Sequence, residues 1–519
     1  MMSGAVSAGH PETAQAAANI LREGGNAFDA VLAGMAAACV CEPVLCSFGG
    51  GGFLMAKSAN GEPWIFDFFA QTPLRHPETK NRDFSPVICD FGPVQQKFHI
   101  GLASMATPGL ARGMFEVNEL LGRMPLGLIL EPAIMLAKKG VPLHKLQARI
   151  FQVVEPIYMD TEASRALFES KVNPGSLVDE GDLIVNTQFA DFLDTLSREG
   201  DDLFYRGEIA ARVAEDCRGQ GGSLTRADFE LFKLEKRKPL SLRYADALIY
   251  TNPPPSIGGQ LIAFALSILP DFGAEGAAFG STAHLSTLVQ AMAFTDEVRM
   301  ESHVHGTSAE EAGALLLSEE MIDAYRQRIA PHPRSYRGTT HISVVDSNGN
   351  AASLTFSNGE GCGYIVPDTG MMMNNMLGEE DINPYGFHNW PTNTRMSSMM
   401  APSLIFDPSG RVTALGSGGS NRIRTAILQV LINLLNFDLG FKDAVQSPRV
   451  HYEGGLLNIE PGFPESAVVN LSQHYDDIKR WDELNLFFGG VHAVCSDARC
   501  GVFDGAGDPR RGGVSIVIS

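Results

Sequence analysis

The chain has 519 residues, 44% of them hydrophobic, which is enough to bury a large core. Its formal net charge of −20 argues against nucleic acid or an anionic membrane surface as a partner, because such partners need basic patches. No Pro/Ser-rich linker and no charge run divides the sequence, so we expect one large unit or two interlocked lobes.

The N-terminal region is predicted to contain two helices and a hairpin. One helix, over 11–23, begins with proline and stops at a glycine pair. Asn26 is the expected N-cap of a second helix over 27–41, and an Asn-Gly turn joins strands at 53–57 and 64–68. The most apolar window covers this second helix and is too short to span a bilayer. The start of the chain lacks a basic and an apolar region, so we expect no signal peptide and a cytoplasmic location.

The rest of the chain divides into a helical part and a hairpin-rich part. The middle third, from about 105 to 330, is predicted to be mostly helical. In the final third, a turn at 407–410 lies between two strands, a long helix follows over 421–435, and the chain ends on the short strand VSIVIS. Hairpins segregated from helices favour a layered α+β fold, with antiparallel sheets covered by helices.

Cysteines and histidines give no sign of a metal site. Cys39, Cys41 and Cys46 cluster on or just after the apolar helix without CxxC spacing, so we expect core thiols. His303 and His305 are too few to bind zinc without further ligands. We therefore expect no metal.

Two glycine-rich runs are candidates for nucleotide binding. Neither FGGGGF (48–53) nor NGEGCG (358–363) has GxGxxG or Walker spacing at the start of a helix. Turns and close backbone approach explain these glycines better, so we expect no cofactor. No GxSxG elbow occurs, which argues against an α/β-hydrolase serine.

A doubled threonine opens the hairpin GTTHISVVDSNGNAASLTF at 338–356. A threonine hydroxyl is a weak nucleophile, but a chain-terminal threonine can use its own α-amine as the base. That amine has an ordinary pKa of about 7.7–8.0, so a useful fraction is neutral near pH 7. Thr339 is internal, so this chemistry requires cleavage of the Gly338–Thr339 bond by an N-to-O acyl shift and ester hydrolysis. The alternative is that two threonines simply favour a strand.

Several motifs, taken in chain order, carry a family resemblance. They are EGGNAFDA, FGGGGF, TNPPPSIGGQ, TTHISVVDSNGNAASLT, MMMNNML, RMSSMMAPSLIF, LGSGGSNRI and GDPRRGG. With them the chain resembles the gamma-glutamyltranspeptidase family of N-terminal-nucleophile (Ntn) hydrolases over nearly its whole length. The hairpin sequence is similar to that family's processing site and is the most specific of the set.

The resemblance implies a four-layer αββα sandwich with a helical middle region, and autocleavage before Thr339. The fragments 1–338 and 339–519 would stay associated as a heterodimer, which can pair further. Thr339 would form an acyl-enzyme with a small-molecule amide, and either water or an acceptor amine would resolve it. Hydrolysis and transfer both remain open.

The resemblance also implies roles for neighbouring hydroxyl groups. Thr340 would support the nucleophile, and the family's second threonine falls on Thr355 or Ser357. The hydroxyl of Ser357 preserves that chemistry.

Two further segments match the family's oxyanion hole and donor site. The turn at 418–420 (Gly418, Gly419 and Ser420) would supply the backbone N–H groups of Gly419 and Ser420 to the developing oxyanion. Ser397 and Ser398 match the paired serines that contact the donor's carboxylate.

The expected substrate clamp departs from the family pattern. The family's glutamate-binding arginine falls on Phe69 in DFFAQTP (67–73), and a phenyl ring cannot replace a guanidinium. Arg75, six residues further along the chain, is the candidate to replace the missing arginine by reaching the substrate from a different direction. An expected asparagine becomes Gly359, and the glutamine and aspartate after the paired asparagines become Met376 and Glu379.

Three hypotheses follow from catalytic motifs that match the family and a substrate clamp that does not. The first is cleavage of gamma-glutamyl amides such as glutathione, and the second is an amidohydrolase or acylase for a non-glutamyl amide, suggested by Phe69. The third is an uncleaved protein that only binds ligands.

Overall fold

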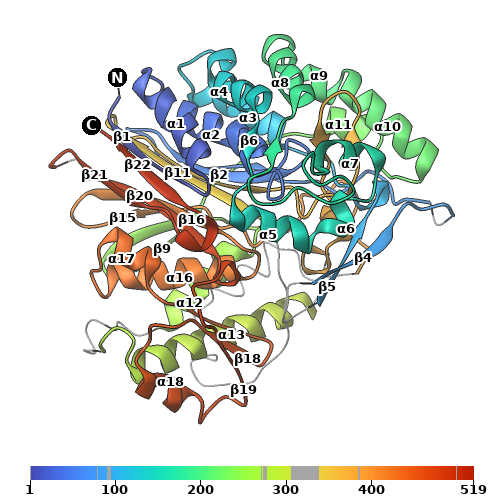
Figure 1. Cartoon of the computed structure of the whole chain (residues 1–519). Helices are drawn as coiled ribbons and strands as arrows, with labels where there is room; N and C mark the ends of the chain where they lie inside the picture. The colour runs from blue at the N-terminus through green and yellow to red at the C-terminus, as the bar shows by residue number, and fades with distance from the viewer. Residues whose placement is uncertain are drawn as a thin grey trace.

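Two antiparallel sheets lie face to face at the centre of the molecule, and helices cover both outer faces (Figure 1). The computed structural model describes residues 2–78, 80–90, 95–269, 272, 277–304, 338–383, 386–497 and 499–519. The four-layer αββα arrangement confirms the predicted α+β class.

The first sheet has seven strands, and the second has six. In spatial order the first contains β22 (Val514–Ile518), β1 (Gly4–Ala8), β11 (Thr340–Asp346), β12 (Ala351–Ser357), β2 (Gly51–Lys57), β3 (Trp64–Phe68) and β8 (Glu235–Arg237). The second contains β21 (Val502–Ala506), β20 (Gly490–Asp497), β16 (Arg411–Gly418), β15 (Ser403–Phe406), β10 (Ala247–Thr251) and β9 (Leu240–Tyr244). Each sheet therefore contains strands from both sides of Thr339.

Helices on the two outer faces bury their apolar sides against the sheets. The first sheet is covered by α1 (Pro11–Arg22), α2 (Ala27–Cys41), α3 (Leu110–Leu121), α4 (Leu126–Lys139) and α8 (Thr187–Glu199). The second is covered by α12 (Gly258–Ile268), α13 (Thr282–Val304), α16 (Arg422–Leu435) and α17 (Phe441–Gln446). Every residue of α2 is buried, and Asn26 caps it with a capping box, as predicted.

Smaller elements complete the described chain. The helices are α5 (Lys145–Val153), α6 (Glu155–Tyr158), α7 (Glu162–Phe168), α9 (Asp202–Tyr205), α10 (Glu208–Gln220), α11 (Arg226–Leu231) and α18 (Glu465–Leu471). The strands are β4 (Ser85–Asp90), β5 (Gln95–Ile100), β6 (Val141–Pro142), β7 (Leu183–Ile184), β13 (Ile365–Val366), β14 (Met371–Met372), β17 (Val450–Glu453), β18 (Leu456–Ile459) and β19 (Asp477–Arg480). Within the described residues, no helix combines the length and the apolar character needed to cross a membrane.

The mostly helical prediction for the middle third is wrong at 235–251, where β8, β9 and β10 form. Burial alternates along β9 and β10, which is the strand period. Ala245 and Asp246 both have positive φ, at 46° and 62°, and make the tight turn between them. Pairing with β3 and β15 supplies the tertiary contacts that a local helical estimate cannot include. The other helices of that region, within the described residues, agree with the prediction.

The cysteine prediction agrees with the structure. All eight cysteines are free, and seven of them, including Cys39, Cys41 and Cys46, are buried. His305 lies outside the described residues.

Candidate active site

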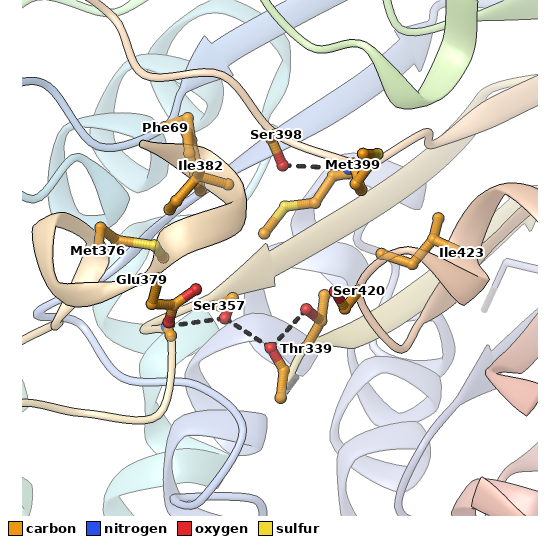
Figure 2. A pocket seen from close by; sticks show the side chains of 13 residues that line it. Phe69, Thr339, Ser357, Met376, Glu379, Ile382, Ser398, Met399, Ser420 and Ile423 are labelled. Carbon is orange, nitrogen blue, oxygen red and sulfur yellow. Dashed lines mark hydrogen bonds between the residues drawn. The ribbon is translucent and has the colours of Figure 1, made fainter. Parts of the chain in front are cut away.

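The pairing of β11 with β12 decides which side chains accompany Thr339. Thr340 lies opposite Phe356 and His341 lies opposite Thr355, so one step further along the hairpin Thr339 meets Ser357. Directly opposed residues point to the same face of a sheet. The two hydroxyl groups therefore lie on the same side, facing the pocket (Figure 2).

Both hydroxyl groups contact the carbonyl oxygen of Gly338. Thr339 Oγ1 donates to it at 2.5 Å and Ser357 Oγ donates at 2.9 Å (Figure 2). Ser357 Oγ in turn accepts the Gly359 N–H at 2.9 Å, which leaves its proton directed at Gly338. The carbonyl of the bond that was predicted to break is thus polarised by two donors.

Thr355 does not belong to this site, contrary to one of the two sequence alternatives. Its Oγ1 lies 2.7 Å from His341 Nδ1, in the layer between the two sheets. The other ring nitrogen of His341 lies 2.9 Å from Ser343 Oγ, and burial lowers the pKa of this histidine well below its usual value. Thr355 thus supports the inter-sheet core. The register could have excluded it, because counting from the Asn-Gly turn places Ser357 opposite Thr339.

Thr340 points to the opposite face of the sheet, toward the end of α2. Its hydroxyl donates to Glu42 Oε2 at 2.8 Å, and Thr13 donates to Glu42 Oε1 at 3.0 Å. Burial raises the pKa of Glu42 to about 7. Sequence reasoning missed Glu42, although a carboxyl group directly after a long apolar run is an unusual feature.

The turn at 418–420 approaches Thr339 from the second sheet. A Cβ on Gly418 would lie 2.1 Å from the carbonyl oxygen of Thr339, so only glycine fits there. Gly419 and Ser420 have φ of 122° and 55°, and Ser420 lines the pocket. Arg511, which sequence reasoning also missed, donates from Nη1 to the Thr339 carbonyl at 3.2 Å. The turn and Arg511 together fix the start of β11.

A small cavity opens beside Thr339. Its lining includes the predicted residues Phe69, Gly359, Met376, Glu379 and Ser398 (Figure 2). The others are Gly338, Thr339, Ser357, Ile382, Met399, Met400, Ser420 and Ile423. Within the part of the chain that the structure describes, this lining contains no lysine or arginine. Ser397 was predicted to contact substrate but does not line the cavity, because its neighbour Ser398 points there instead.

Phe69 occupies the place that sequence reasoning assigned to the missing arginine. It is 1% exposed and stacks on Phe53 with ring centroids 5.2 Å apart. Asp67 fixes the local backbone by accepting the Phe69 N–H at 3.1 Å and by pairing with Arg237 and Arg395. Both guanidinium groups therefore pair with Asp67, and neither arginine lines the cavity.

Arg75 does not replace the missing clamp. It is exposed and is not part of the cavity lining. The chain leaves the cavity after Thr72, whose N–H and hydroxyl bond the backbone of 391–394, and Leu74 then bonds Asp228. These contacts direct Arg75 away from the cavity.

Gly359 and Glu379 both line the cavity and lie against each other. Gly359 has φ of 69°, and a Cβ there would lie 2.3 Å from Glu379 Oε1 and 2.2 Å from Asn375 Oδ1. The asparagine expected at 359 would therefore collide with both side chains. The glycine makes room for a carboxylate that is longer than the aspartate expected at 379.

Comparison with known proteins agrees with this geometry. The sequence model described as Gamma-glutamyltranspeptidase matches residues 13–518. The chain belongs to the gamma-glutamyltranspeptidase family. Among similar curated proteins, the glutathione hydrolase proenzyme of Escherichia coli (strain K12) is 28% identical, covering 96% of this chain and 88% of that protein. The acylase ACY 1 proenzyme of Pseudomonas sp. (strain V22) is also 28% identical, covering 99% of this chain and 94% of that one.

Solved structures show the same architecture for this family member. The cephalosporin acylase from Bacillus halodurans superimposes with a TM-score of 0.83 at 23% identity, covering 99% of this chain and 96% of that one. The chain is thus an enzyme of the hydrolase and transferase type with the Ntn-hydrolase fold. The two kinds of relative, glutathione hydrolases and acylases, correspond to the two enzymatic hypotheses from the sequence.

Proposed function

We propose that Thr339 first cleaves its own chain and then acts as the nucleophile of an amide hydrolase and acyltransferase. The observation that carries this proposal is the convergence of the Thr339 and Ser357 hydroxyls on the Gly338 carbonyl oxygen. Thr339 Oγ1 attacks the Gly338 carbonyl carbon, the C–N bond breaks, and an ester to Gly338 forms with a free α-amine. Water then hydrolyses the ester, which leaves a carboxylate on Gly338 and a free Thr339 hydroxyl.

The fragments 1–338 and 339–519 would remain together because each sheet contains strands from both. β1 lies between β22 and β11, and β2 pairs with β12. In the second sheet, β10 pairs with β15. Separation would break all of these ladders, so a heterodimer is the expected product. The printed names of the E. coli and Pseudomonas relatives, which are proenzymes, support this.

In turnover, the freed α-amine of Thr339 serves as the base for its own hydroxyl. The N–H groups of Gly419 and Ser420 stabilise the oxyanion of the substrate amide. The resulting acyl-enzyme is resolved by water or by an acceptor amine. The residues of this scheme all lie beside the cavity or on the turn against Thr339.

We infer that the preferred acyl group is mainly apolar and has no free carboxylate. Phe69, Met376, Ile382, Met399 and Ile423 give the cavity an apolar wall, and its described lining offers no cation. A carboxylate buried there would lose hydration without gaining an ionic partner. Relatives named as acylases support an amide donor other than glutathione.

Gamma-glutamyl amides such as glutathione are the second candidate. Glu379 can pair with an ammonium group and Ser398 can bind a polar end, and both line the cavity. The glutathione hydrolase relatives support this alternative.

A series of four p-nitroanilides separates the candidates, once denaturing mass spectrometry has verified the Gly338–Thr339 split. The acyl groups are γ-glutamyl, glutaryl (no amine), 4-aminobutanoyl (no α-carboxylate) and butanoyl (neither). We expect the two acyl groups without a carboxylate to give the higher kcat/KM, by about 10-fold. A γ-glutamyl group that reacts fastest of the four would instead establish the glutathione-type activity.

A further inference from the structure

A buried carboxylate, Glu360, contacts the residue on the other side of the predicted cleavage point. Glu360 Oε1 accepts the Gly338 N–H at 2.6 Å, and Oε2 would lie 3.3 Å from a Cβ on Gly338. The carboxylate is 1% exposed. Its backbone is anchored by the Asn375 side chain, whose Oδ1 accepts the Glu360 N–H at 2.9 Å.

We propose that Glu360 positions Gly338 for cleavage and then repels the new carboxylate of Gly338, which clears the cavity for substrate. This inference rests on the chain cleavage proposed above. It assigns Glu360 as a positioning residue, since its contact is with the Gly338 amide and not with the atoms that react.

The positioning step follows from the hydrogen bonds on Gly338. Its carbonyl oxygen is held by Thr339 and Ser357, and its N–H is held by Glu360. With both ends of this residue fixed, its carbonyl carbon stays beside the Thr339 hydroxyl, as a near-attack geometry requires.

The clearing step is needed because Gly338 occupies part of the substrate cavity. Gly338 lines the same cavity as Phe69, Met376 and Ser398, so it stands where the acyl donor must bind. After cleavage it would be the end of a fragment that stays attached through both sheets. A tethered product of this kind has a high effective concentration and competes strongly with free substrate.

Charge supplies the force that removes the product. Cleavage converts the neutral Gly338 carbonyl into a carboxylate, beside Glu360 and in the cavity that Glu379 lines. Like charges repel strongly where water is excluded. The opposite charges of Arg511 and Glu360 interact. The Arg511 hydrogen bond, however, is made to the Thr339 carbonyl, which stays on the other fragment.

Two variants of Glu360 in the full-length protein separate the two steps. Glu360→Gln keeps an acceptor for the Gly338 N–H but removes the charge. We expect chain cleavage within about 3-fold of the wild-type rate, and then a KM for the anilides at least 10-fold higher with kcat unchanged.

Glu360→Ala removes the acceptor and should slow cleavage at least 10-fold. Glu380→Gln, a change at an exposed neighbouring carboxylate, is the matched control and should alter neither step.

Digestion by carboxypeptidase Y, followed by mass spectrometry, reports where the Gly338 end lies. The end should be trimmed readily in the wild type and protected in Glu360→Gln, and slow trimming of the variant should restore its KM. A merely structural role would not produce this rescue.

The outcomes distinguish this inference from the proposed function. If the wild-type protein stays uncleaved, the proposed function fails. If the wild type is cleaved but Glu360→Gln matches it in KM and in trimming, or Glu360→Ala cleaves at the wild-type rate, only the role of Glu360 is overturned.

Discussion

The cavity has two walls of different origin. The hydroxyl wall, formed by Thr339, Ser357 and Ser420, stands on the ends of β11 and β12 and on the turn after β16. The acyl wall is formed by Phe69, Met376, Ile382, Met399 and Ile423. It comes from loops, from the short 3-10 helices η2 (Met376–Gly378) and η3 (Glu380–Ile382), and from the first turn of α16. The hydroxyl wall carries the groups that the proposed chemistry uses, whereas the described residues of the acyl wall include no lysine or arginine.

Because the two walls stand on different elements, the reaction and the substrate specificity can change separately. Sheet register fixes the hydroxyl groups, and a change of register would move every side chain of the strand to the other face. Loop side chains of the acyl wall can be exchanged one at a time without moving the strands. Phe69, Gly359 and Glu379 stand where the family resemblance predicts an arginine, an asparagine and an aspartate, in the same cavity as Thr339.

The largest effect is expected on the hydroxyl wall. Thr339→Ala removes the only hydroxyl that the proposed mechanism uses as nucleophile, so chain cleavage should stop and turnover should fall by about 10³-fold or more. Denaturing mass spectrometry and the anilide assay measure the two effects. Thr339→Ser, which keeps a hydroxyl, is the control and should still be cleaved. A split Thr339→Ala chain would contradict the assignment.

The next largest effect is expected at Ser357, where a substitution should slow chain cleavage, whereas a substitution at Thr355 should not. Ser357→Ala removes one donor to the Gly338 carbonyl oxygen and should slow chain cleavage about 10²–10³-fold. Thr355→Val removes a hydroxyl that contacts His341, so it should lower stability by about 1–3 kcal/mol while cleavage continues. A time course of fragment appearance measures cleavage, and denaturant unfolding measures stability. Equal effects of the two changes on cleavage would argue against the register assignment.

A pH-dependent effect is expected behind the hydroxyl wall, at Glu42. Burial raises the pKa of this carboxyl from 4.5 to about 7. The unfolded chain therefore releases the proton at lower pH than the folded chain, so this group lowers stability as pH rises from about 4.5 to 7. Glu42→Gln should remove that loss, which amounts to about 3 kcal/mol across the window.

Denaturant unfolding at pH 5 and pH 7.5 measures the change at Glu42. The difference in stability between Glu42→Gln and wild type should shift in favour of the variant at the higher pH. Glu23→Gln, at an exposed site, should leave the pH dependence unchanged. Parallel curves for wild type and Glu42→Gln would show that the carboxyl is ionised throughout.

The smallest expected effect lies on the acyl wall. Phe69→Arg places a guanidinium in the cavity that Glu379 also lines, and should raise the preference for γ-glutamyl over 4-aminobutanoyl anilide by about 10-fold. The ratio of kcat/KM values measures it. Phe69→Met removes the ring without adding charge and should not favour the γ-glutamyl substrate. An unchanged ratio in Phe69→Arg would show that another group sets the donor preference.

Much of the fold could be predicted because its signals are local. The capped helix over 27–41, the hairpins at 53–68 and 403–418, and the final strand depend on turn residues and on hydrophobic period. The strands over 235–251 were missed because their partners are distant in sequence, and only pairing with β3 and β15 stabilises them there.

The sequence by itself determined the doubled threonine after a glycine, the hairpin that begins with it, and the glycine turn at 418–420. All three follow from short motifs, and the hairpin register even implies that Ser357 accompanies Thr339. The tertiary structure alone decided that Phe69 faces the cavity while Arg75 does not. It also decided which buried carboxyl groups lie near the predicted cleavage point, since Glu42 lies 298 residues from its partner Thr340. Such contacts arise only when the sheets and helices pack, because no local pattern specifies which distant side chains will meet.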